Sequence, residues 1–188
     1  RKKINKALKN KINIKFSNST DYFEKFKEIY ELNLKDNKAN KKYFFNEDYY
    51  KKIKENLSDN FVLANAFYEN KISSSQLLIY GKKFVHCHLL GTLPTAKSTG
   101  ITNLLHHEFI KWSKNKGFIS LHLGGGLNNR DDDSVLNYKK NFSNTISTFY
   151  IGENIINQNH YKYLCEKNSK NKKLNKIFKY RNEDQIIF

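Results

Sequence analysis

The apolar residues in the first third of the chain alternate between helical and strand spacing. Residues 1–11 carry apolar side chains three and four positions apart, which predicts a short helix. Residues 12–16 alternate apolar and polar side chains, as a half-buried strand does. Helical spacing returns over 22–30, behind the capping residues Ser19–Asp21, and again after Asn46. This part of the chain therefore predicts a helix, a strand and two further helices.

Three strand-like runs follow, at 61–68, 72–80 and 84–90. Three residues separate each run from the next, and such short polar connections favour an antiparallel meander. Beyond them, apolar residues at helical spacing between 101 and 112 predict an amphipathic helix that ends at a Lys-Gly pair. Residues 118–123 alternate again and predict a strand.

The last third of the chain predicts a glycine-rich loop and two further elements before a basic helical tail. A short helix is expected over 134–142 with Asp133 as its cap, and a strand over 146–151. After the opening helix, the predicted order is β-α-α-β-β-β-α-β-α-β. That order predicts an α/β (α+β) fold, in which a mixed central sheet carries helices on both faces.

The length of 188 residues is that of one domain, and we expect residues 1–188 to fold as one. The chain contains no Met and begins with Arg1. We therefore expect it to be a fragment, with residues 1–11 as a helical connection from a missing N-terminal part. Residues 166–188 are expected to form a basic C-terminal extension.

The composition is strongly basic, with 34 Lys and Arg residues against 18 Asp and Glu and a formal net charge of +16. Two interpretations stay open. An anionic partner such as tRNA, a nucleotide, coenzyme A or a membrane surface would be attracted by this charge. Alternatively, the charge reflects a composition rich in Lys, Asn, Ile, Phe and Tyr throughout the chain, and we prefer this interpretation.

Cysteine usage and hydropathy point to a cytoplasmic protein. Cys87 and Cys165 are far apart and belong to no CxxC motif, so reduced thiols are expected rather than a disulfide framework. No apolar stretch approaches the roughly 20 residues that span a bilayer. The basic start of the chain lacks the apolar core of a signal peptide.

Five segments carry a resemblance to a known family. In chain order they are Arg1–Ala7 ahead of a strand, His86–Gly91, Gly117–Gly126, Asp133–Phe142 and Phe149–Gly152. They resemble segments of Fem-type peptidoglycan aminoacyltransferases, whose domains have the GNAT acetyltransferase fold. The similarity covers nearly the whole chain. It implies a GNAT acyltransferase fold and transfer of an acyl group to an amine. Because Fem-type enzymes generally have two such domains, it also implies a second, missing one.

The residues Lys97, Ser98, Thr99, Gly100 and Ile101 form a loop that leads into a predicted helix. Free N–H groups and the positive helix end favour a phosphate at such a position. In the GNAT superfamily the equivalent turn holds the pyrophosphate of coenzyme A, so the resemblance implies an acetyl-CoA or acyl-CoA site here. Only Lys97 and Gly100 match that turn, and Fem-type proteins use aminoacyl-tRNA instead. An ordinary capped loop is the alternative.

Tyr138 and Lys139 occupy the position of an aromatic-Lys pair in Fem-type enzymes. There the lysine is implicated in stabilising the reacting carbonyl. Amine attack on an ester or thioester creates an oxyanion, which a fixed ammonium stabilises. Tyr138 stands where the family usually has Phe, and its hydroxyl adds a proton donor. The alternative is a solvated lysine pair on a short helix.

His86 and His88 are two residues apart in a predicted strand and therefore share a face. If that face meets the acyl site, one of them can accept the proton of the attacking ammonium. Structural histidines are the alternative. We expect no metal, because Cys87 lies on the opposite face and the adjacent His106 and His107 diverge on their helix.

Gly124, Gly125 and Gly126 follow the strand at 118–123 and indicate that the backbone approaches another loop or a ligand closely. Asn128 and Arg130 come next and are candidate contacts for an anionic acceptor. These five residues are the predicted substrate-binding group.

Two hypotheses of different kinds follow. In the first, the chain is an N-acyltransferase whose donor is an acyl-CoA or an aminoacyl-tRNA. Its acceptor is then an amine such as an amino sugar, an amino acid or a peptidoglycan precursor. In the second, the chain is a catalytically inactive GNAT-like module that binds tRNA or a protein partner.

Overall fold

The computed structural model describes residues 1–127 and 132–167. Contacts between residues divide the chain into two units, Arg1–Asn144 and Thr145–Phe188. The second unit is described only as far as residue 167, so the expected extension at 166–188 lies almost wholly outside the described residues.

The first unit begins with helices arranged around one strand. In chain order the elements are α1 (Lys2–Lys9), β1 (Asn13–Ser17), α2 (Thr20–Asp36), a 3-10 turn η1 (Lys41–Tyr43) and α3 (Glu47–Asn56). These match the helix, strand, helix, helix order that the sequence predicts. At the start of α3, the Asn46 side chain accepts a hydrogen bond from the Tyr49 amide at 3.0 Å, which confirms the expected start of this helix.

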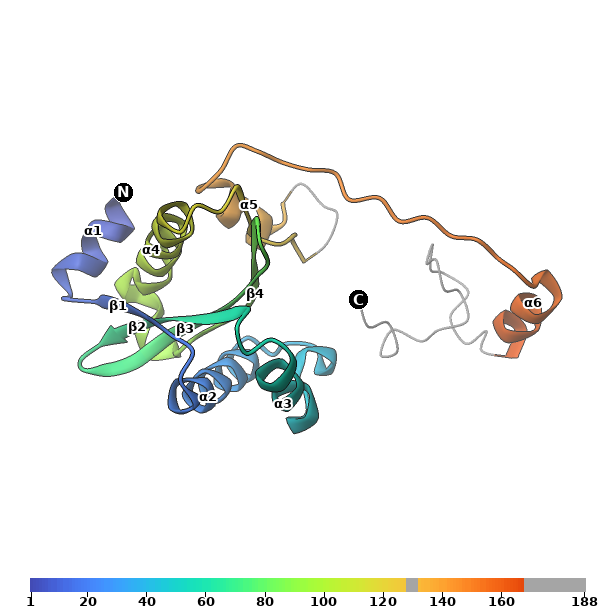
Figure 1. Cartoon of the computed structure of the whole chain (residues 1–188), viewed down its shortest axis with the longest axis horizontal. Coiled ribbons are helices and arrows are strands. Elements are labelled where there is room, and N and C mark those ends of the chain that lie inside the picture. The colour runs from blue at the N-terminus through green and yellow to red at the C-terminus, as the bar shows by residue number, and fades with distance from the viewer. Residues whose placement is uncertain (128–131, 168–188) are drawn as a thin grey trace. The chain divides into compact units, whose positions relative to one another are not determined.

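The remaining elements of this unit complete the sheet and its cover. They are β2 (Phe61–Tyr68), β3 (Lys71–Tyr80), β4 (Phe84–Thr92), a 3-10 helix η2 (Pro94–Thr99), α4 (Ile101–Asn115), β5 (Ser120–His122) and α5 (Ser134–Lys140). The strands lie side by side in the order β1-β2-β3-β4-β5 (Figure 1). Neighbours are antiparallel except for β4 and β5, which run parallel. The expected antiparallel meander and mixed sheet are therefore confirmed.

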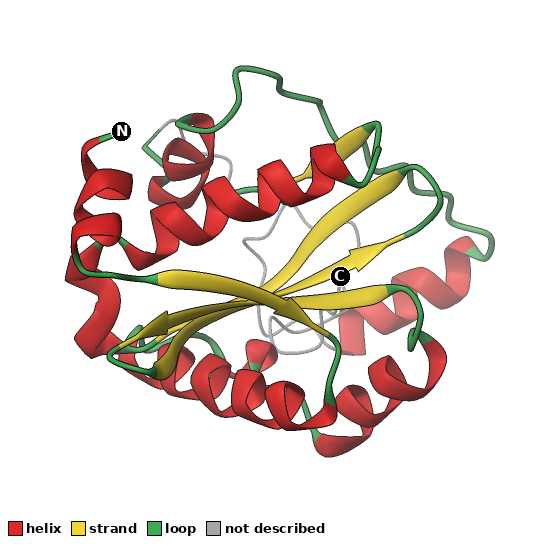
Figure 2. Cartoon of the chain, turned by 60° about the vertical axis from the view of Figure 1, so that its left-hand side comes forward, coloured by secondary structure: helices red, strands yellow, loops and turns green. Residues whose placement is uncertain are grey.

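Helices cover both faces of this sheet, as expected (Figures 1 and 2). On one face, α1 and α4 pack on a core that includes Ala64, Leu78 and Phe109. On the other, α2 and α3 pack on Leu63 and Leu77. Alternate residues of β2 and β3 enter the two cores, which is why these strands are almost continuously buried.

The strand predicted at 146–151 does not form. These residues have no regular secondary structure, and Phe149 and Tyr150 are each 83% exposed. A strand is stabilised by hydrogen bonds to a neighbouring strand, and the sequence of a segment does not show whether such a neighbour exists. Within the described residues, no strand pairs with this segment. The only regular element described in the second unit is α6 (Gln158–Lys167).

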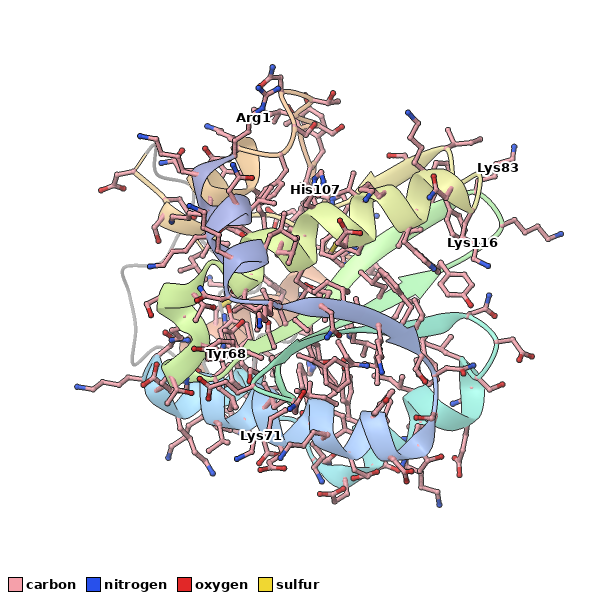
Figure 3. All side chains as sticks on the ribbon, turned by 90° about the vertical axis from the view of Figure 1, so that its left-hand side faces the viewer. Arg1, Tyr68, Lys71, Lys83, His107 and Lys116 are labelled. Carbon is pink, nitrogen blue, oxygen red and sulfur yellow. The ribbon has the colours of Figure 1, made fainter. Side chains whose placement is uncertain are left out.

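The surface is basic on several sides. Arg1, Lys71, Lys83 and Lys116 are exposed and come from separate parts of the chain (Figure 3). Cys87 and Cys165 are free thiols. Among the helices that are described, none has the length and apolar character needed to cross a membrane.

Candidate functional site

The strands β4 and β5 part from each other after a short paired stretch. Their register joins Phe84 to Ser120 and ends with His86 opposite His122. Beyond that pair β4 continues to Thr92, whereas β5 ends and its chain runs into the glycine loop at 124–126. We refer to the two diverging segments, 87–92 and 123–126, as the β4–β5 fork.

Side chains of β3 hold the β4 arm of the fork. The Gln76 amide donates to the Leu89 carbonyl at 3.1 Å, and the Ser74 hydroxyl donates to the Gly91 carbonyl at 3.0 Å. The register between β3 and β4 shifts by one residue at His88, as in a β-bulge. These polar side chains are buried, so they fix the β4 backbone where it has lost β5 as a neighbour.

Close packing on α2 explains the glycine in this arm. A Cβ at Gly91 would lie 2.7 Å from both the Cα and the amide nitrogen of Tyr30, distances that real Cβ atoms essentially never show. The β4 backbone therefore lies directly against the α2 backbone at this point.

Lys139 reaches the other arm of the fork from α5. Its ammonium donates to the Gly125 carbonyl at 2.6 Å, and a Cβ at Gly124 would lie 3.0 Å from its Nζ atom. Burial lowers the pKa of Lys139, while Cys87 and Asp133 act in the opposite direction. The structure therefore brings Lys139 together with the predicted substrate loop, whereas Asn128 and Arg130 lie outside the described residues.

Asp133 joins the glycine loop to α5. Its carboxylate accepts from the Leu136 amide at 2.7 Å, which confirms the expected helix cap, and it also accepts from the Leu127 amide. A Cβ at Gly126 would lie 2.6 Å from this carboxylate. Glycine at that position lets the loop approach Asp133 closely, and so fixes the loop relative to Lys139.

Tyr138 points away from the glycine loop, toward the buried His106 of α4. Its hydroxyl lies 3.4 Å from His106 Nδ1, and the two rings meet edge to face at 5.3 Å. His106 Nδ1 also donates to the Thr102 carbonyl at 3.0 Å, and its ring stacks on Phe142. Burial lowers the pKa of His106 to about 4 and raises the pKa of Tyr138. This cluster anchors α5 and thereby orients Lys139.

Three histidines line one side of the fork. The rings of His86 and His88 are 5.8 Å apart, on the same face as their spacing predicts, while Cys87 packs against the core under α1 and α4. His122 stacks on His86 at 5.1 Å between centroids. Sequence reasoning did not select His122, although its position opposite His86 in two parallel strands was the signal that identifies it.

His88 is held differently from His86. Its Nε2 atom forms a short hydrogen bond with the Tyr49 hydroxyl of α3. Burial raises the pKa of Tyr49 to about 12, so the hydroxyl keeps its proton at neutral pH. Burial lowers the pKa of His88 to about 4, with His86 acting in the same direction. The tautomer of His88 sets which of the two groups donates, and in either case its Nε2 atom is engaged by Tyr49.

A protein-family model also matches the sequence of this chain, in agreement with the parted parallel strands and the helices on both faces of the sheet. The model described as acetyltransferase (GNAT) domain matches residues 1–140. The chain belongs to this family. The finer Fem-type resemblance is not part of that match and stays a prediction.

Solved structures show the same GNAT fold at low sequence identity. One is an aminoglycoside acetyltransferase from an uncultured soil metagenomic sample in complex with sisomicin (18% identity, TM-score 0.53, covering 76% of this chain and 97% of that one). Another is an aminoglycoside N-acetyltransferase in complex with CoA (11% identity, TM-score 0.51, 77% and 95% coverage). A third is the C-terminal domain of a putative lysylphosphatidylglycerol synthetase from Agrobacterium fabrum (15% identity, TM-score 0.52, 67% and 40% coverage). A search of curated protein sequences gives no match.

The predicted phosphate loop of this GNAT domain is closed. Lys97 forms an ion pair with Asp36 at 2.6 Å and also donates to the Asn37 side chain, so its ammonium is engaged at the end of α2. Ser98 is exposed, but Thr99, Gly100 and Ile101 are buried. The Lys97 ammonium is therefore engaged by α2, and the residues that begin α4 are covered.

Two local contacts account for this closure. The Thr99 hydroxyl, at the end of η2, accepts a hydrogen bond from the Ile101 amide at 3.3 Å, so the first amide of α4 is engaged. Gly100 has a φ of +86°, and a Cβ there would collide with the Lys3 carbonyl of α1. Helix α1 therefore lies over the start of α4.

The described residues contain no group of three or more His, Cys, Asp or Glu side chains arranged to hold a metal ion. The chemistry that the fork itself offers comes from an ammonium, backbone amides and imidazoles.

Proposed function

We propose that this GNAT domain is an N-acyltransferase that holds the acyl carbonyl of its donor in the β4–β5 fork beside Lys139. An amine that attacks this carbonyl forms a tetrahedral oxyanion. Collapse of the oxyanion breaks the bond to the sulfur or oxygen of the leaving group. The observation that carries the proposal is the Lys139 ammonium at the Gly125 carbonyl, at the mouth of two parted strands. By analogy with a single oxyanion-hole donor, this ammonium would stabilise the transition state by about 3–4 kcal/mol.

The state of Lys139 supports an enzyme over an inactive binding module. The ammonium is half-buried, and no carboxylate within the described part of the chain forms an ion pair with it. Removing a cation from water without an ion-pair partner costs free energy. Groups held in this way are characteristic of sites that stabilise charge during a reaction. A module that only binds RNA would be served equally well by exposed lysines.

The donor is an activated acyl group, and two kinds of donor have separate support. The CoA complex of a structural neighbour supports an acyl-CoA. Two observations support an aminoacyl ester such as aminoacyl-tRNA. They are the Fem-type segments and the structural similarity to the C-terminal domain of a putative lysylphosphatidylglycerol synthetase. The closed α4 N-terminus speaks against a diphosphate bound there in the present conformation.

The acceptor that we propose is a primary amine carried on a polar molecule, with amino sugars as the first class to test. The sisomicin complex of a structural neighbour supports this class. Amino acids and peptidoglycan precursors are the further classes that the Fem-type segments suggest. The histidines at the fork supply groups that can accept the proton of such an amine.

The test is a transfer assay with acetyl-CoA and aminoacyl-tRNA as donors and a panel of amino sugars and cell-wall precursors as acceptors. Lys139→Ala should lower the rate of transfer by about a hundredfold or more, as expected for loss of an oxyanion-hole donor. Lys140→Ala is the matched control, because Lys140 is exposed on the same helix. Absence of transfer with every donor, or full activity of the Lys139→Ala protein, would refute the proposal.

A further inference from the structure

His86 and His122 are joined by a direct hydrogen bond at the point where the fork opens. Their Nδ1 atoms are 3.0 Å apart and their ring planes differ by 21°. They are also the last residues paired between β4 and β5. The backbone register therefore holds the two imidazoles in contact, and one ring is half-buried while the other is exposed.

The bond between the two rings restricts where their protons are. One Nδ1 atom must donate and the other must accept, so the neutral pair carries a single proton between the rings. When His86 is the donor, its Nε2 atom has a free lone pair, and His122 carries its only N–H proton on Nε2. A proton added to His86 Nε2 is then matched by one released from His122 Nε2, after the shared proton moves from His86 to His122.

We propose that the pair His86–His122 carries the proton of the acceptor amine from the fork to solvent. The inference rests on the proposed function. The acceptor arrives as R–NH3⁺ and gives one proton to His86 Nε2. The shared Nδ1 proton passes to His122, and His122 loses its Nε2 proton to water. The free amine then attacks the acyl carbonyl, and the proton on the tetrahedral nitrogen leaves with the sulfur or oxygen of the donor. Once the product has left, His122 Nε2 takes a proton from water, the shared proton returns to His86, and His86 Nε2 gives its proton to water in the emptied fork, which restores the starting pair. His122 acts through His86 and is thus a positioning and relay residue.

The charges around the pair favour this direction of transfer. Burial, then His122, then the Lys139 ammonium lower the pKa of His86. His88 also faces His86, but its Nε2 is occupied by Tyr49 of α3, which stays neutral at physiological pH. A protonated His86 is therefore short-lived, and the exposed His122 is the neighbour through which its proton reaches water.

Two substitutions at His122 separate a relay from a structural role. His122→Phe keeps a stacked ring without nitrogen, and His122→Ala leaves a space that free imidazole can enter. Both should reduce turnover by about tenfold or more with little change in the acceptor KM. Added imidazole should restore the Ala protein but not the Phe protein. Because His122 contributes to the low pKa of His86, the acid limb of the pH profile should move to higher pH in both.

His107→Ala is the control, since His107 is exposed on α4, where its ring lies 4.0 Å from the Glu108 carboxylate of the same helix (Figure 3). Its turnover and response to imidazole should match the wild type. Full turnover of His122→Ala at every pH, or a loss that imidazole does not restore, would overturn the relay.

Imidazole-nitrogen NMR tests the pair without any activity. The pKa of His86 should rise in His122→Phe, because His122 contributes to lowering it in the wild type. A His86 pKa that the substitution leaves unchanged would contradict the proposal. If the wild type transfers no acyl group, the proposed function fails and the NMR result alone decides whether the pair shares its proton.

Discussion

Acidification should destabilise this domain through His106, a histidine that the proposed reaction does not use. The ring is 3% exposed, and burial lowers its pKa from 6.5 to about 4. In the unfolded chain it titrates near 6.5, so between these values the unfolded state binds more protons than the folded one. Stability therefore falls as the pH falls through this window.

The size of the effect follows from the two pKa values. Linkage gives a loss of about 2 kcal/mol at pH 5 and about 3 kcal/mol at pH 4 from this residue alone. That is a substantial share of the roughly 5–15 kcal/mol by which domains are usually stable. His88 has a similarly low pKa and should add to the loss.

Urea unfolding followed by circular dichroism at pH 7, 6 and 5 measures the effect. His106→Phe keeps a ring against Phe142 but removes the titrating group. It leaves the half-buried Tyr138 hydroxyl without this contact, which costs about 1 kcal/mol at every pH. The variant should thus be less stable at pH 7 yet lose less stability on acidification.

Adding Tyr138→Phe to His106→Phe removes the hydroxyl that lost its contact. The double variant should therefore regain part of the stability that His106→Phe loses, without restoring the pH dependence. The reasoning is refuted if His106→Phe and the wild type lose the same free energy of unfolding between pH 7 and pH 5. In that case the acid sensitivity would reside in other groups.

Three further substitutions test the packing around the site. Gly100→Ala should destabilise the domain by about 1–2 kcal/mol from its positive φ alone, and more because α1 must shift, as measured by urea unfolding. Asp133→Ala should lower the melting temperature through loss of a helix cap worth about 1 kcal/mol, and should also slow acyl transfer because the glycine loop loses its tie to α5. Lys97→Ala should change stability by less than about 1 kcal/mol, because its ion pair is partly exposed. If it abolishes donor binding in a thermal-shift titration, the phosphate-loop prediction regains support.

Much of the fold could be predicted from the periodicity of apolar residues. The meander of β2, β3 and β4 is encoded locally, because Glu69 and Asn70 adopt the positive φ angles that a tight hairpin turn needs. The amphipathic α4 and the Asp133 cap are likewise local features. The strand at 146–151 was predicted wrongly for the opposite reason, since its β-forming residues have no described neighbour with which to pair.

The proximity of some candidate site residues could be predicted from the sequence, and their roles stay predictions. Lys139 and the glycine loop follow each other within a short segment, so their meeting is a local consequence of the Asp133 turn. The role of Lys97 could not be judged from sequence, because its partner Asp36 lies sixty-one residues away at the end of α2. His122 was missed because only the parallel register of two strands separated by α4 brings it to His86.

The Lys139 ammonium at the fork has two opposing effects on the proposed reaction. The Lys139 ammonium is placed where it would attract the oxyanion that forms when the amine attacks. The same charge repels a protonated amine and lowers the pKa of His86, so it favours the free amine but weakens the base that must produce it. A single half-buried imidazole would be a poor proton acceptor beside this cation. The hydrogen bond from His86 to the exposed ring of His122 overcomes this difficulty, because the proton moves away from Lys139 as it leaves His86. On this reasoning, replacing Lys139 with a neutral residue should raise the pKa of His86, and histidine NMR of Lys139→Ala will show whether it does.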